Sequence, residues 1–172
     1  LKPIDVLTQL PPGFIAGDWL AGMPALPVIA SGMVGSAQGW REAAYVPVPA
    51  DAAALAAALL RFEAWPGTDL HIVPGVRSAG DRPDVMRGEE TQILGAVGDE
   101  VPAGRAPDVL VLPGTHSKWA CVAEGRIETF ATFLTGECYA VLKDHSILGR
   151  LMAAGPAAPA VTRTRAPCAD RF

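Results

Sequence analysis

Short apolar runs separated by glycine and proline predict β-strands at four points of the chain. Leu26 to Ala30 precedes a glycine-rich turn, and Leu70 to Val73 stops at a Pro-Gly pair, so both are expected to be buried strands. Ala44 to Val48 is a weaker strand, which its internal proline restricts to the edge of a sheet. Val109 to Leu112 is uniformly apolar and predicts the best-buried strand of the four.

Helices and one hairpin are predicted between and after these strands. Asp51 occupies an N-cap position ahead of an alanine-leucine stretch, 52–62. Residues 85–97 have helical spacing with Gly88 near the start, and a last helix is expected over about 137–152 behind Thr135. The runs 119–123 and 126–134 flank a Glu-Gly pair, which is typical of a tight antiparallel turn.

The alternation of strands and helices predicts an α/β fold, a mixed sheet with flanking helices. From residue 153 the pattern ends, because the last 20 residues contain three prolines and have no apolar period. Residues 153–172 are therefore expected to be a disordered tail or an aberrant one, such as the product of a shifted reading frame.

Composition narrows the functional classes. With 172 residues, 50% of them hydrophobic, the chain has ample material for a core. A net charge of −4 without a basic block argues against bulk binding to nucleic acid or anionic membrane, and no apolar run approaches the length of a membrane span. Three cysteines without a Cys-x-x-Cys pair argue against a disulfide framework and fit a reducing cytoplasm.

Four polar segments could carry chemistry. One is Thr135-Gly136-Glu137 at the start of the last helix, where capping of the helix is the default interpretation; the first along the chain is the loop 31–40. Its three glycines follow a buried strand, where open α/β sheets bind ligands, and they allow the backbone to approach a ligand closely. A plain flexible loop is the alternative.

The second segment, 86–92, has adjacent carboxylates, Glu89 and Glu90, at a predicted helix start. One could act as a base or orient a hydroxyl while Arg87 binds an anion. Favourable interaction of both acids with the helix dipole is the alternative. Adjacent helical residues point about 100° apart, so only one of the pair is expected to face a site.

The third segment, 112–119, joins a buried strand to a hairpin strand. Its glycine, hydroxyl groups and lysine could bind phosphate, although the segment is not a Walker A loop. A polar entry to the hairpin is the alternative. No residues with the spacing of a protein metal site are found in the sequence.

Taken together, these segments resemble the 2-dehydro-3-deoxygalactonokinase family, a member of the actin-like sugar-kinase superfamily. The pairing of RGEETQ with PGTHSKW, in that order, is far more specific than either motif alone. The similarity covers about residues 4–152 and rests on PVIASGMVGSAQGW (27–40), LHIVPGV (70–76), PDVMRGEETQILGA (83–96), VLPGTHSKW (111–119) and FLTGECYAVLKDHSILGRL (133–151).

The resemblance implies an actin-like (RNase H-like) sugar-kinase fold with two related domains that close over ATP and substrate. Residues 1–107 would form most of the first domain, on the substrate side. Residues 108–152 would begin the second domain with a phosphate-contacting strand, hairpin and helix. The implied reaction transfers the γ-phosphoryl group of ATP to the 6-hydroxyl of 2-dehydro-3-deoxy-D-galactonate in the cytoplasm, as part of galactonate catabolism.

The resemblance also assigns roles to residues, because positioning and charge stabilisation dominate phosphoryl transfer. Glu90 would accept or orient the hydroxyl proton, with Glu89 in reserve, and Mg²⁺ would bridge the β- and γ-phosphates of ATP, largely through water. The sugar acid would be held by Gly32, Met33, Gly35, Ser36 and Arg87. The ATP phosphates would be bound by Gly114, Thr115, Ser117 and Lys118.

The sequence departs from the family at both ends. The family's N-terminal Asp-x-Gly-Thr/Ser phosphate motif and its C-terminal half have no counterpart here, so a fragment is expected. The alternative function is a catalytically inactive remnant that at most binds a sugar acid. Exposed sheet edges would favour a homo-oligomer, and the sequence leaves the oligomeric state open.

Overall fold

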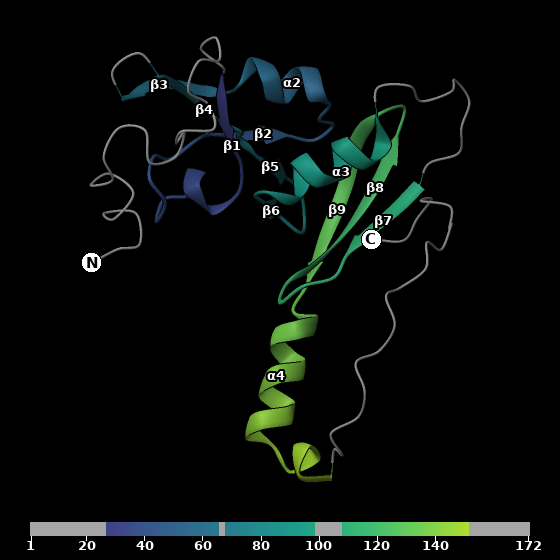
Figure 1. Ribbon diagram of the computed structural model, residues 1–172. Helices are drawn as coiled ribbons and strands as arrows, with labels where there is room; N and C mark the ends of the chain where they lie inside the picture. The colour runs from purple at the N-terminus through teal and green to yellow at the C-terminus, as the bar shows by residue number, and fades with distance from the viewer. Residues whose placement is uncertain (1–26, 66–67, 99–107, 152–172) are drawn as a thin grey trace.

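The computed structural model describes residues 27–65, 68–98 and 108–151. These residues form three small sheets and three α-helices, and the strands of the first two sheets alternate along the chain (Figure 1). The elements are β1 (Val28–Ala30), the 3-10 turn η2 (Met33–Gly35), β2 (Tyr45–Pro47), α2 (Ala52–Ala57), β3 (Leu60–Trp65), β4 (Thr68–Ile72), β5 (Gly75–Ser78), β6 (Asp84–Met86), α3 (Glu89–Val97), β7 (Asp108–Leu112), β8 (Ser117–Ala123), β9 (Arg126–Phe133), α4 (Thr135–His145) and η3 (Ile147–Leu151).

The α/β class is confirmed, but the strands form three sheets of three rather than one mixed sheet. In the first, β4 lies between parallel β1 and antiparallel β3. In the second, β5 lies between parallel β2 and antiparallel β6. The third is the antiparallel series β7-β8-β9. Strand β4 ends at Ile72 and β5 begins at Gly75, so the chain leaves the first sheet at residues 73–74 and enters the second.

Several predicted elements are confirmed. Strands β1, β2, β4 and β7 lie within or next to the apolar runs, and β2 is at a sheet edge as its proline requires. The burial expected for β1 is wrong, because β1 is an edge strand and Ile29 is exposed. Asp51 caps α2, because its carboxylate accepts a 2.7 Å hydrogen bond from the N–H of Ala54. The hairpin turns at Glu124 (φ 51°) and Gly125 (φ 76°), two consecutive positive φ angles that match the twist of a two-residue hairpin.

Other predicted boundaries are wrong. The helix expected over 52–62 ends at Ala57, and β3 begins at Leu60 because this segment pairs with β4 across the sheet. The helix expected over 85–97 begins only at Glu89; residues before it form β6, which pairs with the unpredicted β5. Strand β7 is half-buried rather than fully buried.

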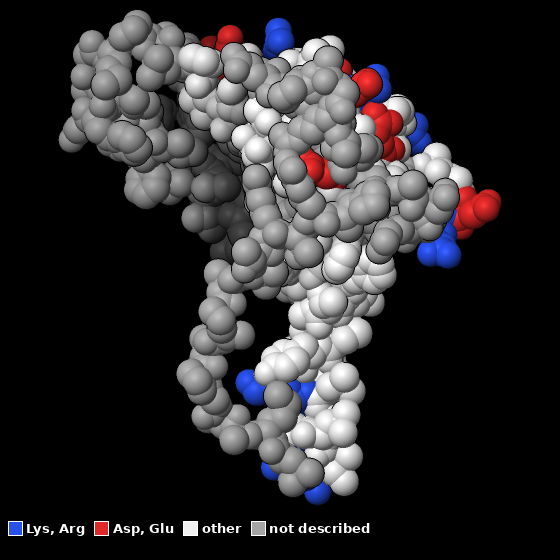
Figure 2. All heavy atoms as spheres, turned by 90° about the vertical axis from the view of Figure 1, so that its right-hand side faces the viewer, with Lys and Arg blue, Asp and Glu red and all other residues white. Residues whose placement is uncertain are grey.

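The last helix, α4, also differs from the prediction. It begins at Thr135 and ends at His145, and the N-cap is Leu134 without a side-chain capping bond. The helix has no buried residue and projects from the body of the molecule together with η3 (Figure 1). In the space-filling view, basic side chains gather at the far end of this projection (Figure 2).

The larger hydrophobic core contains residues that precede segment 99–107 and residues that follow it. In this core, β6 and α3 pack against the β8–β9 hairpin. Its buried members are Ala50, Leu55, Val73, Val76, Met86, Ile93, Ala120, Val122, Ile127 and Phe130. A smaller core around Ala43, Leu70 and Ile72 lies beneath the first sheet.

Some expectations fall outside the described residues, among them the tail 153–172. Cys138 is free and exposed. Within the described ranges, no helix is long and apolar enough to span a bilayer.

Candidate functional site

The carboxylate of Glu90 lies at the start of α3, folded back on the helix N-cap. The N–H of Gly88 donates to both carboxylate oxygens, at 2.8 and 2.7 Å, and the hydroxyl of Thr91 donates to one of them at 3.4 Å. Gly88 can take this position because it adopts a φ of 107°, which side-chain-bearing residues rarely reach. The side chain of Glu90 is fully buried, with 0% of the residue exposed.

Burial raises the pKa of Glu90 above its ordinary value, because the carboxylate loses hydration. Backbone N–H groups of Glu90 and Gly88 oppose this shift, Glu89 adds to it, and Arg87 opposes it weakly. Glu89 is in a different environment: it is half-buried, and its carboxylate accepts a 3.1 Å hydrogen bond from the N–H of Arg87. A carboxyl with a raised pKa suits proton transfer near neutral pH better than a solvated one.

Arg87 connects this helix start to the N-terminal segments. Its Nη2 donates to the carbonyl of Ala43 at 2.7 Å, and its guanidinium lies 4.2 Å from the centre of the Tyr45 ring. Its Nη1 lies next to Gly35, where an added Cβ would come within 3.0 Å. Within the described part of the chain, Nε and Nη1 are buried without a hydrogen-bond partner. These two donors are therefore available to an anion that reaches them.

The glycine loop predicted to hold the sugar acid packs against the same place. A Cβ on Gly88 would lie 3.1 Å from the Cα of Gly32, so the two loops meet backbone to backbone. Gly35 and Ser36 are buried, and the Ser36 hydroxyl has no partner among the described residues. Met33 is 64% exposed and makes none of these contacts. The structure thus brings together Gly32, Gly35, Arg87 and Gly88, beside Glu90.

Sequence reasoning missed the residues that hold Arg87. The ring of Tyr45 lies against Gly75, where an added Cβ would come within 2.5 Å of a ring carbon. Gly75 starts β5, which pairs with β2 in register Tyr45 to Gly75. The Pro-Gly pair after the run at 70–73 signalled a strand end, but nothing in the sequence linked that glycine to a tyrosine 30 positions earlier.

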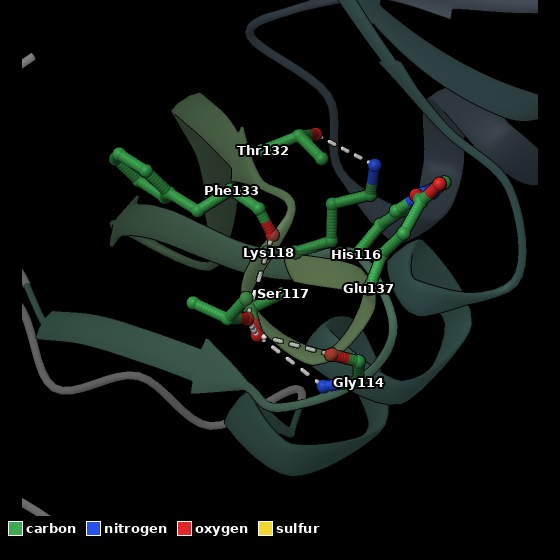
Figure 3. Close-up of polar contacts among 8 residues, drawn as sticks. Gly114, His116, Ser117, Lys118, Thr132, Phe133 and Glu137 are labelled. Carbon is green, nitrogen blue, oxygen red and sulfur yellow. Dashed lines mark hydrogen bonds and ion pairs between the residues drawn. The ribbon is translucent and has the colours of Figure 1, made fainter. Parts of the chain in front are cut away.

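A second polar cluster surrounds the turn between β7 and β8. Here the first turn of α4 packs on the β7–β8 turn, with Gly136 N–H donating to the Gly114 carbonyl at 3.2 Å and Glu137 N–H donating to the Thr115 carbonyl at 3.1 Å. The Ser117 hydroxyl accepts from the N–H of Gly114 at 3.3 Å (Figure 3). It also contacts the Thr135 hydroxyl. Exposed backbone and hydroxyl groups in a glycine turn can bind an oxyanion.

A pair that the sequence did not predict, His116 and Glu137, joins this turn to α4. The two side chains meet at 2.6 Å and each is about half exposed (Figure 3). Their separation of 21 residues gave no local signal. The pair adds a second attachment of the helix to the turn, beside the backbone bonds.

Lys118 points away from this turn. Its residue is 7% exposed, and its ammonium donates to the carbonyl of Val85 at 3.0 Å and to the Thr132 hydroxyl at 2.6 Å. In Figure 3 the lysine extends toward Thr132, on the opposite side of β8 from Ser117 and Gly114. A phosphate role for Lys118 would require the ammonium to leave both acceptors.

The described residues include no cluster of three or more histidine, cysteine, aspartate or glutamate side chains that could hold a metal ion. The donor groups present, N–H and hydroxyl in both clusters, fit anionic ligands.

Comparisons with known proteins give concordant matches. A family model for 2-keto-3-deoxy-galactonokinase matches residues 10–166. A Rhizobium meliloti (strain 1021) protein, named a probable 2-dehydro-3-deoxygalactonokinase, is 44% identical over 151 residues, which cover 81% of this chain and 47% of the relative. The 2-dehydro-3-deoxygalactonokinase of Escherichia coli (strain K12) is 41% identical over 150 residues, with coverages of 86% and 46%.

A crystal structure agrees with these relatives. The protein, described as a 2-dehydro-3-deoxygalactonokinase from Sinorhizobium meliloti, matches with a TM-score of 0.65 at 42% identity and covers 79% of this chain and 45% of that chain. The matches assign the chain to a class of carbohydrate kinases. It belongs to the 2-keto-3-deoxy-galactonokinase family, as the motif resemblance predicted. The chain spans about half the length of the curated relatives it matches.

Proposed function

We propose that this chain takes part in the ATP-dependent phosphorylation of 2-dehydro-3-deoxy-D-galactonate at its 6-hydroxyl, in galactonate catabolism. Membership of the kinase family supports the reaction class. The observation that carries the proposal is the fully buried Glu90, with its raised pKa, beside Arg87 and the Gly32 loop. An enzyme that phosphorylates a sugar acid needs a base for the attacking hydroxyl, a cation for the carboxylate of the acid, and a backbone that can approach the sugar. In this proposal Glu90, Arg87 and the Gly32 loop supply these three.

In this proposal Glu90 accepts the proton of the attacking hydroxyl. Its hydrogen bond from Gly88 holds the carboxylate in one orientation, and burial keeps its pKa nearer to the working pH than that of an exposed acid. Glu89 remains the second candidate, because it lies in the same helical turn, but its carboxylate already accepts from the backbone of Arg87.

Arg87 and the loop 32–36 bind the sugar acid. The unpaired Nε and Nη1 of Arg87 offer charge-assisted hydrogen bonds to the substrate carboxylate, and the unpaired Ser36 hydroxyl offers another. Gly32 and Gly35 let the backbone approach the ligand, with Met33 at the exposed rim. Since the donors of Arg87 are buried, substrate entry requires a small separation of the loop from α3.

The nucleotide side is proposed for the β7–β8 turn. Gly114, Thr115 and Ser117 would bind the phosphates of ATP through N–H and hydroxyl groups, whereas the ammonium of Lys118 is held by Thr132 and Val85. When bound with ATP, Mg²⁺ would supply positive charge to offset the negative charge of the phosphates. We also propose that the whole protein has an actin-like fold, with a domain boundary between residues 107 and 108, and that it works in the cytoplasm. Exposed sheet edges would favour a homo-oligomer.

Sugar-acid binding without catalysis is the second candidate, because the unpartnered donors of Arg87 and Ser36 can hold an acid without any turnover. We would measure ADP release from ATP and Mg²⁺ with and without the sugar acid, and sugar-acid binding by calorimetry. Glu90→Gln should lower turnover by at least about 100-fold and leave binding nearly unchanged. Glu89→Gln is the matched control and should keep most of the turnover.

The outcomes separate the candidates. Turnover that needs the sugar acid and disappears in Glu90→Gln supports the kinase. Binding of the sugar acid without turnover, in a folded wild-type chain, supports the second candidate. A wild-type chain that neither binds the sugar acid nor releases ADP contradicts both.

A further inference from the structure

Lys118 belongs to a part-buried polar network that joins two parts of the molecule. The network contains Lys118 on β8, Thr132 on β9, and Asp84 and Val85 on β6. Lys118 and Thr132 are cross-strand partners in the hairpin, whereas β6 belongs to another sheet. Among the described strands no backbone ladder joins β6 to the hairpin, so these side chains make the polar connection between them.

The directions of the hydrogen bonds are fixed by chemistry. An ammonium can only donate and a carboxylate can only accept, so the Thr132 hydroxyl accepts from Lys118 at 2.6 Å and donates to Asp84 at 2.9 Å. The other oxygen of Asp84 accepts from the Thr132 N–H at 2.7 Å. Aligned bonds with a charge at each end strengthen one another where water is partly excluded, as it is here.

The position of β6 depends on this network. Strand β6 has only three residues and pairs with β5 along one side, so it is the terminal strand of its sheet. On its other side, Lys118 satisfies the carbonyl of Val85. Arg87 and Gly88 follow within three residues of Val85, and Gly88 holds the carboxylate of Glu90. A shift of β6 would therefore move both the anion-binding and the base candidates.

We propose that Lys118 is a positioning residue, which acts through Thr132 and Val85 to fix the sugar-acid side of the site relative to the β7–β8 turn, and is not a ligand of the ATP phosphates. This inference rests on the proposed function for what the two sides bind. Phosphoryl transfer depends on the alignment of the acceptor with the phosphates, so a fixed spacing between the two sides has a direct chemical purpose.

Four variants of the full chain test the proposal: Lys118→Met, Thr132→Val, the double variant, and Thr132→Ser as the control that keeps the hydroxyl. Calorimetry measures the affinity for 2-dehydro-3-deoxy-D-galactonate and, separately, for ATP with Mg²⁺. Lys118→Met and Thr132→Val should each weaken sugar-acid binding by roughly tenfold and leave ATP binding unchanged. The double variant should be no worse than either single variant, and Thr132→Ser should match wild type.

A phosphate ligand would give the opposite pattern. If Lys118→Met weakens ATP binding while Thr132→Val does not, the proposal is overturned. Additive losses in the double variant would overturn it too, because they would mean that the two residues act separately.

Amide hydrogen exchange keeps the test independent of the proposed function. If wild type binds neither ligand, the proposed function fails, but the network can still be tested through exchange of the Gly88 and Thr132 N–H groups. Both should exchange faster in Lys118→Met and Thr132→Val than in Thr132→Ser. Unchanged exchange at Gly88 in both variants would overturn the positioning role.

Discussion

Replacing Gly88 by alanine should damage the sugar-acid side of the site by two separate effects. Gly88 has a φ of 107°, and a side chain in such a conformation costs about 1–2 kcal/mol. In addition, the new Cβ would lie 3.1 Å from the Cα of Gly32, closer than ordinary contact, so the glycine loop must move by a few tenths of an ångström. Overpacking of this kind costs typically about 1–3 kcal/mol.

Gly80 provides a matched control, because it shares the strain but not the contact. Its φ is 119°, and an added Cβ would meet nothing within 4 Å. Gly80→Ala should therefore lose about 1–2 kcal/mol of unfolding free energy, and Gly88→Ala should lose at least about 1 kcal/mol more. Urea denaturation at equilibrium measures both values, and the slope with denaturant shows whether the two variants unfold from equally compact states.

Sugar-acid affinity also separates the effect of the Gly88–Gly32 contact from the effect of backbone strain. Gly88→Ala separates the loop at Gly32 from the start of α3 and displaces the N–H that holds Glu90, so sugar-acid affinity should fall. Gly80→Ala should bind as wild type does. Equal losses of stability in the two variants, with equal sugar-acid affinity, would refute the claim that the two loops depend on close backbone packing.

Three further predictions follow from single contacts. Because the folded pKa of Glu90 is raised, folding stability should fall as pH rises from the unfolded value through the folded one; denaturant titrations should show this slope in wild type and not in Glu90→Gln. Gly75→Ala would put a Cβ 2.5 Å from the Tyr45 ring, and should lower both stability and sugar-acid affinity, whereas Gly75→Ala with Tyr45→Leu should recover part of the stability in the same titration. Gly136→Ala would put a Cβ 2.5 Å from the carbonyl of Gly114, and calorimetry should show weaker ATP binding with unchanged sugar-acid binding; the reverse split would contradict the assignment of the turn.

Local patterns predicted those parts of the fold in which neighbouring residues determine the structure. Asp51 caps its helix because the cap depends on residues within one turn, and the Glu124–Gly125 turn depends on two residues alone. The boundary at Leu60 was wrong because an alanine-leucine run has high helix propensity, whereas pairing of β3 with β4 decides the outcome. Strand β6 was missed since its pairing with β5 is not local either.

The difference between local and long-range contacts also explains which features of the sugar-acid side could be predicted. Glycines after a strand and acids at a helix start marked the loop 32–36 and Glu90 as candidates. That Gly32 touches Gly88, and that Arg87 lies over Tyr45, depends on contacts between segments more than 40 positions apart, which no local pattern encodes. The resemblance to a kinase family grouped these residues by role, and the structure supplies the contacts between them.

Lys118 shows how strand geometry limits what a contiguous motif can do. A run of donors such as GTHSK predicts one phosphate-binding unit. Once the segment enters a strand, however, successive side chains point to opposite faces of the sheet. Ser117 faces the turn and Lys118 faces the core side, where Thr132 is its cross-strand partner. Because β8 begins at Ser117, the period of two already separates the hydroxyl from the ammonium, and a buried ammonium needs fixed acceptors, which Val85 and Thr132 provide.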